Sequence, residues 1–502
     1  MSTMLPQGSA WTPELIEIYY EAIEKIAREY GLDTYPNQLE LITWEQMVDA
    51  YTSTGLPMMY NHWTFGMEFT KIERSYRKGE SGLAYELVIN SDPCISYLME
   101  NNTMTMQALV IAHAAFGHNS FFKGNYLFRE WTDAKGFMNY LEFAKNYIAQ
   151  CEERYGTRAV ELVLDSAHAL RSHGVDRFKK PKRLSPTEEL VRLKERAKFM
   201  DANYDPVLAT TALEHEAVKE TVTHGVNELK FMEEENLLYF LEKQSPALEN
   251  WEREILRIVR KIAQYFYPQG QTKVMNEGWA CFWHYTILRT MEERGLVGPG
   301  FMLEFFKDHT NVVSQLGFDH KYFNGINPYA LGFRMFQEIR RVCEHPTDED
   351  REWLPDIAGT DWRKTLEHAM RNHRDESFIA QYLTPKLIRE FRLFALQNDS
   401  EKDHYEVLDI HDPEGYKHVR SVLARQYDFG VLQPNIEVRS LDPVNGALTL
   451  VHKMHDGWPL SQGVEDVVFH FYQLWQRPVQ LLAEYEVDGE MVTEQLCQFE
   501  FD

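Results

Sequence analysis

The sequence predicts a mainly helical N-terminal domain with a short strand segment, followed by a small α+β C-terminal domain. Stretches with helix-capping residues and helical apolar patterns occupy the chain up to about residue 392. Beyond that point the pattern changes to short, β-prone runs bounded by Asp, Asn, Gly and Pro. We therefore expect one domain over residues 1–392 and a second over residues 393–502.

The first helix is marked at both of its ends. Thr12 is a suitable N-cap, Pro13 suits the first helical position, and Gly31 follows the last turn. A strand is expected over residues 83–90, and residues 103–122 form an apolar stretch typical of a buried helix. Further helices are expected over 134–155, 158–172, 206–243, 247–266, 275–293, 328–343, 375–392, 414–427 and 464–475.

A basic segment interrupts the helical domain at about residues 171–190. Residues 171–183 contain six Lys or Arg and one Asp, and Gly174 and Pro181 break regular structure there. The segment is interpreted as a solvated linker or loop, with a local docking site for an acidic group as the alternative.

The composition excludes several classes of protein. The 502 residues are 44% hydrophobic, enough for a large core, and their net charge of -25 argues against binding nucleic acid or anionic membranes. No signal peptide is recognised, and no apolar run approaches the roughly 18–20 residues that cross a bilayer. The five cysteines include no CxxC pair, so we expect reduced thiols and a cytoplasmic protein.

Two histidines in the apolar stretch are the first candidates for chemistry. His113 and His118 are five residues apart, and a regular helix would place them about 140° from each other. They could face one ion only if a π-bulge inserted one residue, for which Gly117 is a suitable place, or if the helix ended at Gly117.

A second stretch, "NEGWACFWH" at residues 276–284, carries Glu277 and His284. They lie about 10 Å apart along a regular helix, so Glu277 alone, or Glu277 with His113 and His118, is a more suitable ligand set than Glu277 with His284. Burying ionisable groups in such apolar stretches is costly without a partner or a metal. Gly278 is explained equally well by the close approach of another backbone or of a ligand and by tight helix packing.

Other polar residues stand in apolar surroundings. The residues concerned are His62, Asp165, His168 and His173, and each taken singly is interpreted as a hydrogen-bonded structural residue. The chain contains no Walker loop, Rossmann fingerprint, GxSxG elbow or HExxH motif, and "HEAVKE" at 215–220 has Lys219 in place of the second histidine.

Several long motifs resemble the SpoVR (stage V sporulation protein R-like) family. They are "MYNHWTFGMEF", "YELVINSDPCISYLMENNTMTMQ", "AHAAFGHNSFFKGNYLF", the segment ending "TKVMNEGWACFWH", and "NPYALGFRMF". The resemblance spans most of the chain. It implies a role in sporulation cortex formation or in stress and stationary phase, with a serine protein kinase and a von Willebrand-type protein as partners. A non-catalytic regulator or adaptor of that kinase system is the alternative to an enzyme.

The order of parts is also similar to that of glutamate-type zincin metallopeptidases. That resemblance implies zinc, or another divalent metal, held by His113, His118 and Glu277, in a hydrolase acting on peptide or peptidoglycan-related amide bonds. Ala114 stands where such enzymes have their general base. The base would then be Glu86, Asp165 or His284, unless the protein binds metal without turnover.

Overall fold

The structure is a computed structural model that describes most of the chain. The described residues are 4–52, 56, 59–64, 86–179, 191, 234–317, 320–321, 323, 325–393, 395–397, 406–409, 412–428, 435–442, 444–454, 463–487 and 490–500. They form two compact units: Met1–Gln150 with Tyr265–Leu432, and Cys151–Gln264 with Gln433–Asp502. The domain boundary expected at residue 393 stays a prediction.

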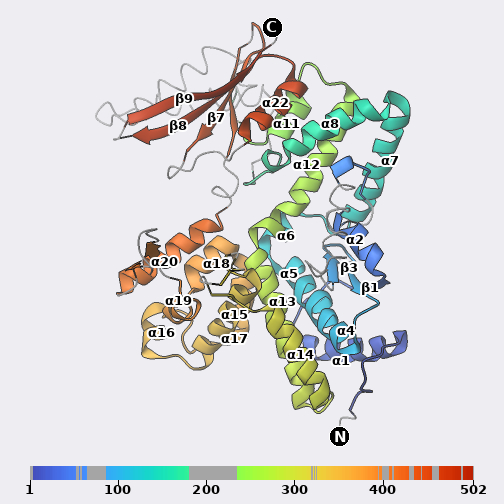
Figure 1. Cartoon of the computed structure of the whole chain (residues 1–502), viewed down its shortest axis with the longest axis vertical. Coiled ribbons are helices and arrows are strands. Elements are labelled where there is room, and N and C mark those ends of the chain that lie inside the picture. The colour runs from blue at the N-terminus through green and yellow to red at the C-terminus, as the bar shows by residue number, and fades with distance from the viewer. Residues whose placement is uncertain are drawn as a thin grey trace. The chain divides into compact units, whose positions relative to one another are not determined.

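The first unit is mainly helical (Figure 1). Its first chain segment contains α1 (Pro13–Glu29), β1 (Asn37–Ile42), α2 (Trp44–Thr52), β2 (Glu86–Ile89), β3 (Cys94–Met99), α4 (Met104–Val110), the π-helix η1 (Ile111–His118), α5 (Asn119–Gly124), α6 (Tyr126–Trp131) and most of α7 (Phe137–Tyr155). Its second segment contains the end of α12 (Asn250–Gln271), then α13 (Lys273–Glu293), α14 (Pro299–Val312), α15 (Pro328–Glu344), α16 (Asp348–Trp353), α17 (Trp362–Asn372), α18 (Asp375–Tyr382), α19 (Pro385–Phe391), β4 (Ala395–Gln397), β5 (Glu406–Asp409) and α20 (Pro413–Gln426).

Local sequence signals explain where many of these helices begin. The Thr12 side chain accepts a hydrogen bond from Leu15 N and caps α1, as expected. The helix expected over 375–392 is instead two helices, α18 and α19. Thr384 caps the second one, and Pro385, which has no backbone N–H to donate, occupies its first turn. Of the helix expected over 206–243, residues 206–233 lie outside the described residues.

A small mixed sheet lies beside the buried helices. Its strand order is β1-β3-β2, with β1 parallel and β2 antiparallel to β3. The expected strand at 83–90 is therefore β2, an edge strand, and both β2 and β3 contact η1. The sheet thus supports the part of the chain that carries the two histidines.

Helix α13 lies at the centre of the first unit, where it packs against α15 on one side and η1 on another. Its backbone is close to both neighbours: a Cβ added to Gly278 would lie 2.3 Å from Gly332 C, and one added to Gly117 would lie 2.6 Å from Ala280 Cα. The approach of another backbone through tight helix packing, expected as an explanation for Gly278, is therefore confirmed. Glycine at these positions lets the three helices come together without a steric clash.

The start of α13 is held by a side chain from α18. The buried Asp375 carboxylate accepts hydrogen bonds from Val274 N and Met275 N, each at 2.8 Å. Burial raises the pKa of Asp375 to about 7, although these backbone donors act in the opposite direction. A carboxylate at a helix N-terminus satisfies orphan N–H groups, so it fixes the position of α13.

The second unit combines helices with the four-stranded sheet of the expected α+β region. It contains the end of α7, α8 (Thr157–Ala169), the short helix η2 (Arg171–His173), α11 (Leu237–Gln244), most of α12, β6 (Glu437–Leu441), β7 (Leu448–Lys453), α22 (Val464–Trp475), β8 (Val479–Val487) and β9 (Glu490–Phe499). The strand order is β6-β7-β8-β9, with β7 and β8 parallel. Helix α22 packs against β8, β9 and α8. Of the basic segment expected at 171–190, the structure describes only residues 171–179.

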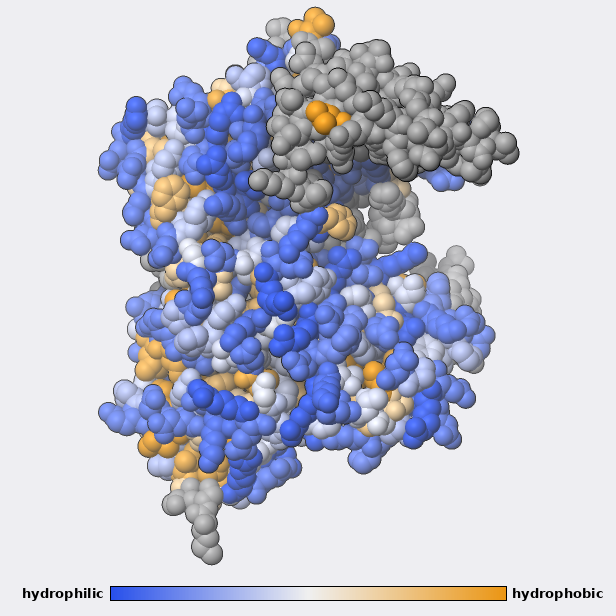
Figure 2. Space-filling view, turned by 180° about the vertical axis from the view of Figure 1, so that it is seen from behind, coloured by the Kyte–Doolittle hydropathy of each residue, from blue (hydrophilic) through white to orange (hydrophobic). Residues whose placement is uncertain are grey.

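The face drawn in Figure 2 is covered largely by hydrophilic residues, in keeping with the net charge of -25. Within the described ranges, no helix is both long enough and apolar enough to cross a membrane.

Candidate metal centre

The π-helix brings His113 and His118 to the same side of the chain. Residues 111–118 are wound as a π-helix, and Asn119 N–H donates to Ala114 O, five residues earlier. The helix continues directly into α5, so the π-bulge expected near Gly117 is confirmed and the alternative of a helix end there is wrong. The two imidazole rings lie edge to face with their centroids 4.6 Å apart.

Glu277 of α13 completes a group of three side chains. Its Oε2 atom lies 3.7 Å from His113 Nε2 and 3.5 Å from His118 Nε2. Two ligands of one tetrahedral zinc ion are separated by about 3.3 Å, given Zn–N and Zn–O distances of about 2.0–2.1 Å. The Nε2 atoms of both histidines thus face the same Glu277 oxygen. Their distances from it are close to the distance between two ligand atoms bound to one zinc ion. These three side chains could hold a metal ion.

The opposite nitrogen of each histidine has a hydrogen-bonding partner. Asn276 Oδ1 lies 2.9 Å from His118 Nδ1 and accepts its proton, which leaves the lone pair of His118 at Nε2. His113 Nδ1 shares a hydrogen bond with His284 Nδ1 at 2.8 Å. Metal-binding histidines ordinarily have such a partner on the nitrogen that faces away from the ion. The surroundings therefore fit a metal at the two Nε2 atoms.

The electrostatics of the group also suit a cation. Burial lowers the pKa of His113 to about 4, so this histidine is neutral near pH 7 and can offer a lone pair. Burial alone would raise the pKa of Glu277, but the charge of His118 and contacts with His113 and Tyr329 lower it below its usual value. A metal ion binds histidine in its neutral form, and with both imidazoles neutral the carboxylate would give the three side chains a net charge of about -1. A divalent cation would be attracted to that charge.

The group meets solvent at Glu277. The Glu277 side chain is 18% exposed, whereas those of His113 and His118 are 4% and 8% exposed. Tyr329, in the first turn of α15, is half-buried and contacts Glu277. A ligand from solution would therefore approach from the side of the carboxylate.

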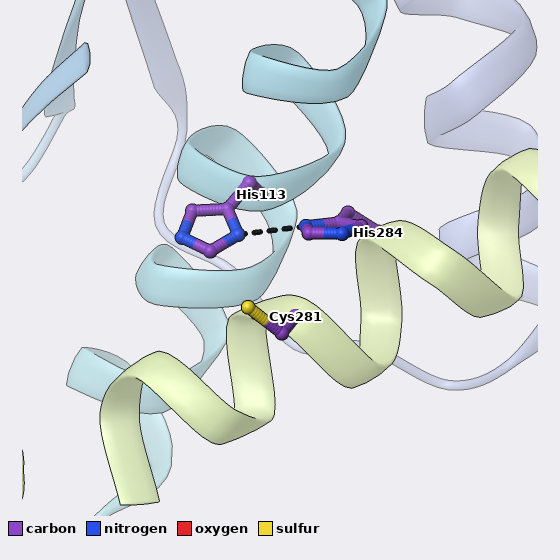
Figure 3. A group of neighbouring side chains, drawn as sticks. All are labelled: His113, Cys281 and His284. Atoms are coloured by element: carbon purple, nitrogen blue, oxygen red, sulfur yellow. Dashed lines mark hydrogen bonds between the residues drawn. The ribbon is translucent and has the colours of Figure 1, made fainter. Parts of the chain in front are cut away.

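His284 lies behind His113 and does not face the metal side of the group. Its Nε2 atom shares a second hydrogen bond, at 2.7 Å, with His309 Nδ1 of α14. Figure 3 shows His113 and His284 facing each other across the interface between η1 and α13, with Cys281 one turn before His284. His113, Cys281 and His284 form a second set whose ligand atoms lie within 4.8 Å of one another.

The other sequence candidates are placed differently. Asp165 belongs to α8 of the second unit, so its proposed part in the chemistry stays a prediction. Glu86 begins β2, the strand that contacts η1, and its side chain lies outside the described residues. His62 is buried and bonded through Nδ1 to Thr64 Oγ1 at 2.6 Å, in keeping with a structural residue.

Three residues of the site environment escaped the sequence analysis: Asn276, His309 and Tyr329. Asn276 directly precedes Glu277, so its place in the same motif was a usable signal. His309 and Tyr329 lie on α14 and α15, and only the packing of these helices against α13 brings them near the group.

The fold and this group define a mainly helical protein with a cluster of histidine and glutamate side chains that could hold a metal ion. The chain belongs to the SpoVR family. Residues 10–432 match the family model described as "SpoVR like protein", and residues 434–486 match "SpoVR-like C-terminal domain".

One relative is the "Uncharacterized protein YcgB" of Escherichia coli (strain K12). It is 51% identical over 498 residues, which cover 99% of this chain and 97% of the relative. The comparison with solved structures gives no match.

Proposed function

We propose that this SpoVR-family protein is a metal-dependent hydrolase of amide bonds, in which His113, His118 and Glu277 hold the metal. The observation that carries the proposal is the convergence of two Nε2 atoms, at 3.7 and 3.5 Å, on one oxygen of Glu277. Two histidines and a glutamate are a donor set of zinc peptidases, which keep a further position open for water or substrate. Zinc bound there would activate that water and polarise a carbonyl.

The chain's own residues would then position the reactants. Glu277 is the most exposed of the three side chains, so the open position would face solvent beside it. The contact with Tyr329 helps to keep Glu277 ionised, as its lowered pKa indicates. Glu86 remains a candidate general base because β2 packs beside η1, whereas His284 is occupied by His113 and His309. Peptides and peptidoglycan-related stem peptides are the proposed substrate class, following the resemblance to zincins and the family's link to spore cortex.

Metal content and amide hydrolysis test the proposal together. Protein purified without chelators should contain about one equivalent of zinc or another divalent metal, as one ion held by His113, His118 and Glu277 requires. His113→Ala and Glu277→Gln should lose both the metal and hydrolysis of a muropeptide panel. His368→Ala, which changes an exposed histidine on α17, is the matched control and should keep both. Metal-free wild-type protein, or hydrolysis that survives in Glu277→Gln, would contradict the proposal.

A second candidate function is a regulator or adaptor of a serine protein kinase system. The acidic balance of the chain, with 77 Asp and Glu against 52 Lys and Arg, favours docking to a basic partner. Capture of the kinase or the von Willebrand-type protein by the full chain would support this function. Loss of capture at raised salt would indicate that charge carries the contact.

A further inference from the structure

A chain of three buried histidines runs from the candidate metal centre into the protein. His113 Nδ1 lies 2.8 Å from His284 Nδ1, and His284 Nε2 lies 2.7 Å from His309 Nδ1. The three residues come from η1, α13 and α14, so their alignment results from the packing of separate elements. They are 3%, 1% and 5% exposed, respectively.

The directions of the two hydrogen bonds depend on each other. A neutral histidine carries one N–H, so it can donate from one ring nitrogen only and must accept at the other. All three side chains are buried, where a charged imidazolium would be costly, so the neutral form of each ring is favoured. The chain therefore has two possible directions, one with every proton pointing toward His309 and one with every proton pointing toward His113.

Only one direction suits a metal at His113. Binding through Nε2 requires the lone pair of His113 to be at Nε2 and its proton at Nδ1. His113 then donates to His284 Nδ1, and His284 donates from Nε2 to His309 Nδ1. By accepting this hydrogen bond, His309 Nδ1 favours the His113 tautomer that can bind a metal. It acts on His113 through His284.

The same geometry disfavours a second metal at His113, Cys281 and His284. The 2.8 Å between the two Nδ1 atoms is a hydrogen-bond distance. Two nitrogens bound to one zinc ion would be about 3.3 Å apart. One of the two Nδ1 atoms therefore carries the proton and the other accepts it with its lone pair, so neither is free to bind a metal.

We infer that His284 and His309 are positioning residues that set the tautomer of His113 and thereby the metal affinity of the site. The inference rests on the proposed function and names the residues that tune its metal centre. Tyr285, Phe305 and Phe333 surround the His309 ring, with centroids 5.1, 5.7 and 4.7 Å away, and hold it in this orientation.

The test compares two nearly isosteric substitutions at His309. His309→Asn places an amide oxygen near the position of Nδ1 and keeps an acceptor for His284, whereas His309→Leu removes it. Zinc affinity is measured on the full chain by competition with a chromophoric chelator. His309→Leu should weaken zinc binding by about 10- to 100-fold, as is usual when an outer partner of a metal ligand is lost. His309→Asn keeps the acceptor, so its zinc affinity should stay within about threefold of wild type, below that range.

A second readout follows the tautomers themselves. In zinc-loaded protein with ¹⁵N-labelled histidine, His284 and His309 should carry their protons at Nε2 and His113 at Nδ1. The opposite assignment, or equal zinc affinities of His309→Leu and His309→Asn, overturns the inference and leaves the proposed function standing. Wild-type protein that binds no zinc overturns both, so the two failures are distinguishable. His368→Ala, which changes an exposed histidine on α17, is the control and should keep the wild-type affinity.

Discussion

Gly278 of α13 and Gly332 of α15 lie against each other so closely that a Cβ on Gly278 would come within 2.3 Å of the Gly332 carbonyl carbon. A Cβ on Gly332 would meet Val274 O at 2.0 Å. This contact fixes how closely α13 packs against α15. Helix α13 carries Glu277 and His284, so the contact also helps to position these two side chains.

Gly278→Ala should therefore destabilise the protein. The added methyl group forces two backbones apart and should lower the free energy of unfolding by about 1–3 kcal/mol or more, as overpacking does. Thermal or urea unfolding measures the change. Gly270→Ala in α12 is the matched control, because nothing lies within 4 Å of its added Cβ. That substitution should raise stability by about 0.5–1 kcal/mol. Equal effects at the two glycines would contradict the role given to the close contact.

Asn276 should control metal binding through His118. Asn276→Leu removes the acceptor for His118 Nδ1–H and should reduce zinc affinity by about 10- to 100-fold. Asn276→Asp keeps an oxygen in the same place and should hold the affinity near that of wild type or above it. A competition titration with a chelator distinguishes the two variants. If both bind zinc alike, the hydrogen bond does not orient His118.

Cys281 should not be a metal ligand. Cys281→Ser should leave the metal content unchanged, because the Nδ1 atoms that would complete its ligand set are bonded to each other at 2.8 Å. Cobalt-substituted wild-type protein should accordingly lack the near-ultraviolet charge-transfer band of a thiolate–cobalt bond. A band that disappears in Cys281→Ser would instead place a metal at Cys281.

Stability should fall in mildly acidic solution. Burial, with a smaller effect of the His113 charge, lowers the pKa of His309 from 6.5 to about 4 in the folded protein. As the pH falls from 6.5 toward 4, the unfolded chain gains a proton at this histidine that the folded protein does not, so folding is disfavoured. The loss at this residue should reach about 3 kcal/mol at 1.36 kcal/mol per pKa unit.

Urea unfolding of metal-free protein between pH 7 and 4 measures this effect. His309→Asn cannot titrate in that range and should show a shallower decline in stability than wild type. Identical slopes for the two proteins would mean that His309 gains its proton equally in the folded and unfolded states.

The sequence was sufficient for elements with their own start and stop signals. Thr12 and Pro13 mark the beginning of α1, and residues 464–475 form the helix α22 over the same bounds as expected. The expectation of one helix over 375–392 is wrong, because the chain forms α18 and α19 with a break before Pro385. Thr384 and Pro385 are buried, and their packing favours the start of a second helix that Thr384 caps.

The candidate site was partly predictable for a geometric reason. A spacing of five residues is incompatible with a regular helix if both histidines face one partner, so His113 and His118 required a π-bulge. Glu277 was recognisable as an ionisable group in an apolar stretch. His309 was not, because it lies 25 residues beyond His284 and approaches it only through the packing of α14.

The winding of η1 has a consequence for how such sites are recognised in other chains. A motif search built on regular helices accepts histidines separated by three intervening residues and rejects the four found between His113 and His118. A pattern with one additional residue, a glycine just before the second histidine and a distant Asn-Glu-Gly triplet would find the arrangement described here. The same reasoning makes the site sensitive to length: removing one residue between His113 and His118 would restore ordinary helical spacing. The deletion would also rotate His118 and the residues of α5 relative to α13.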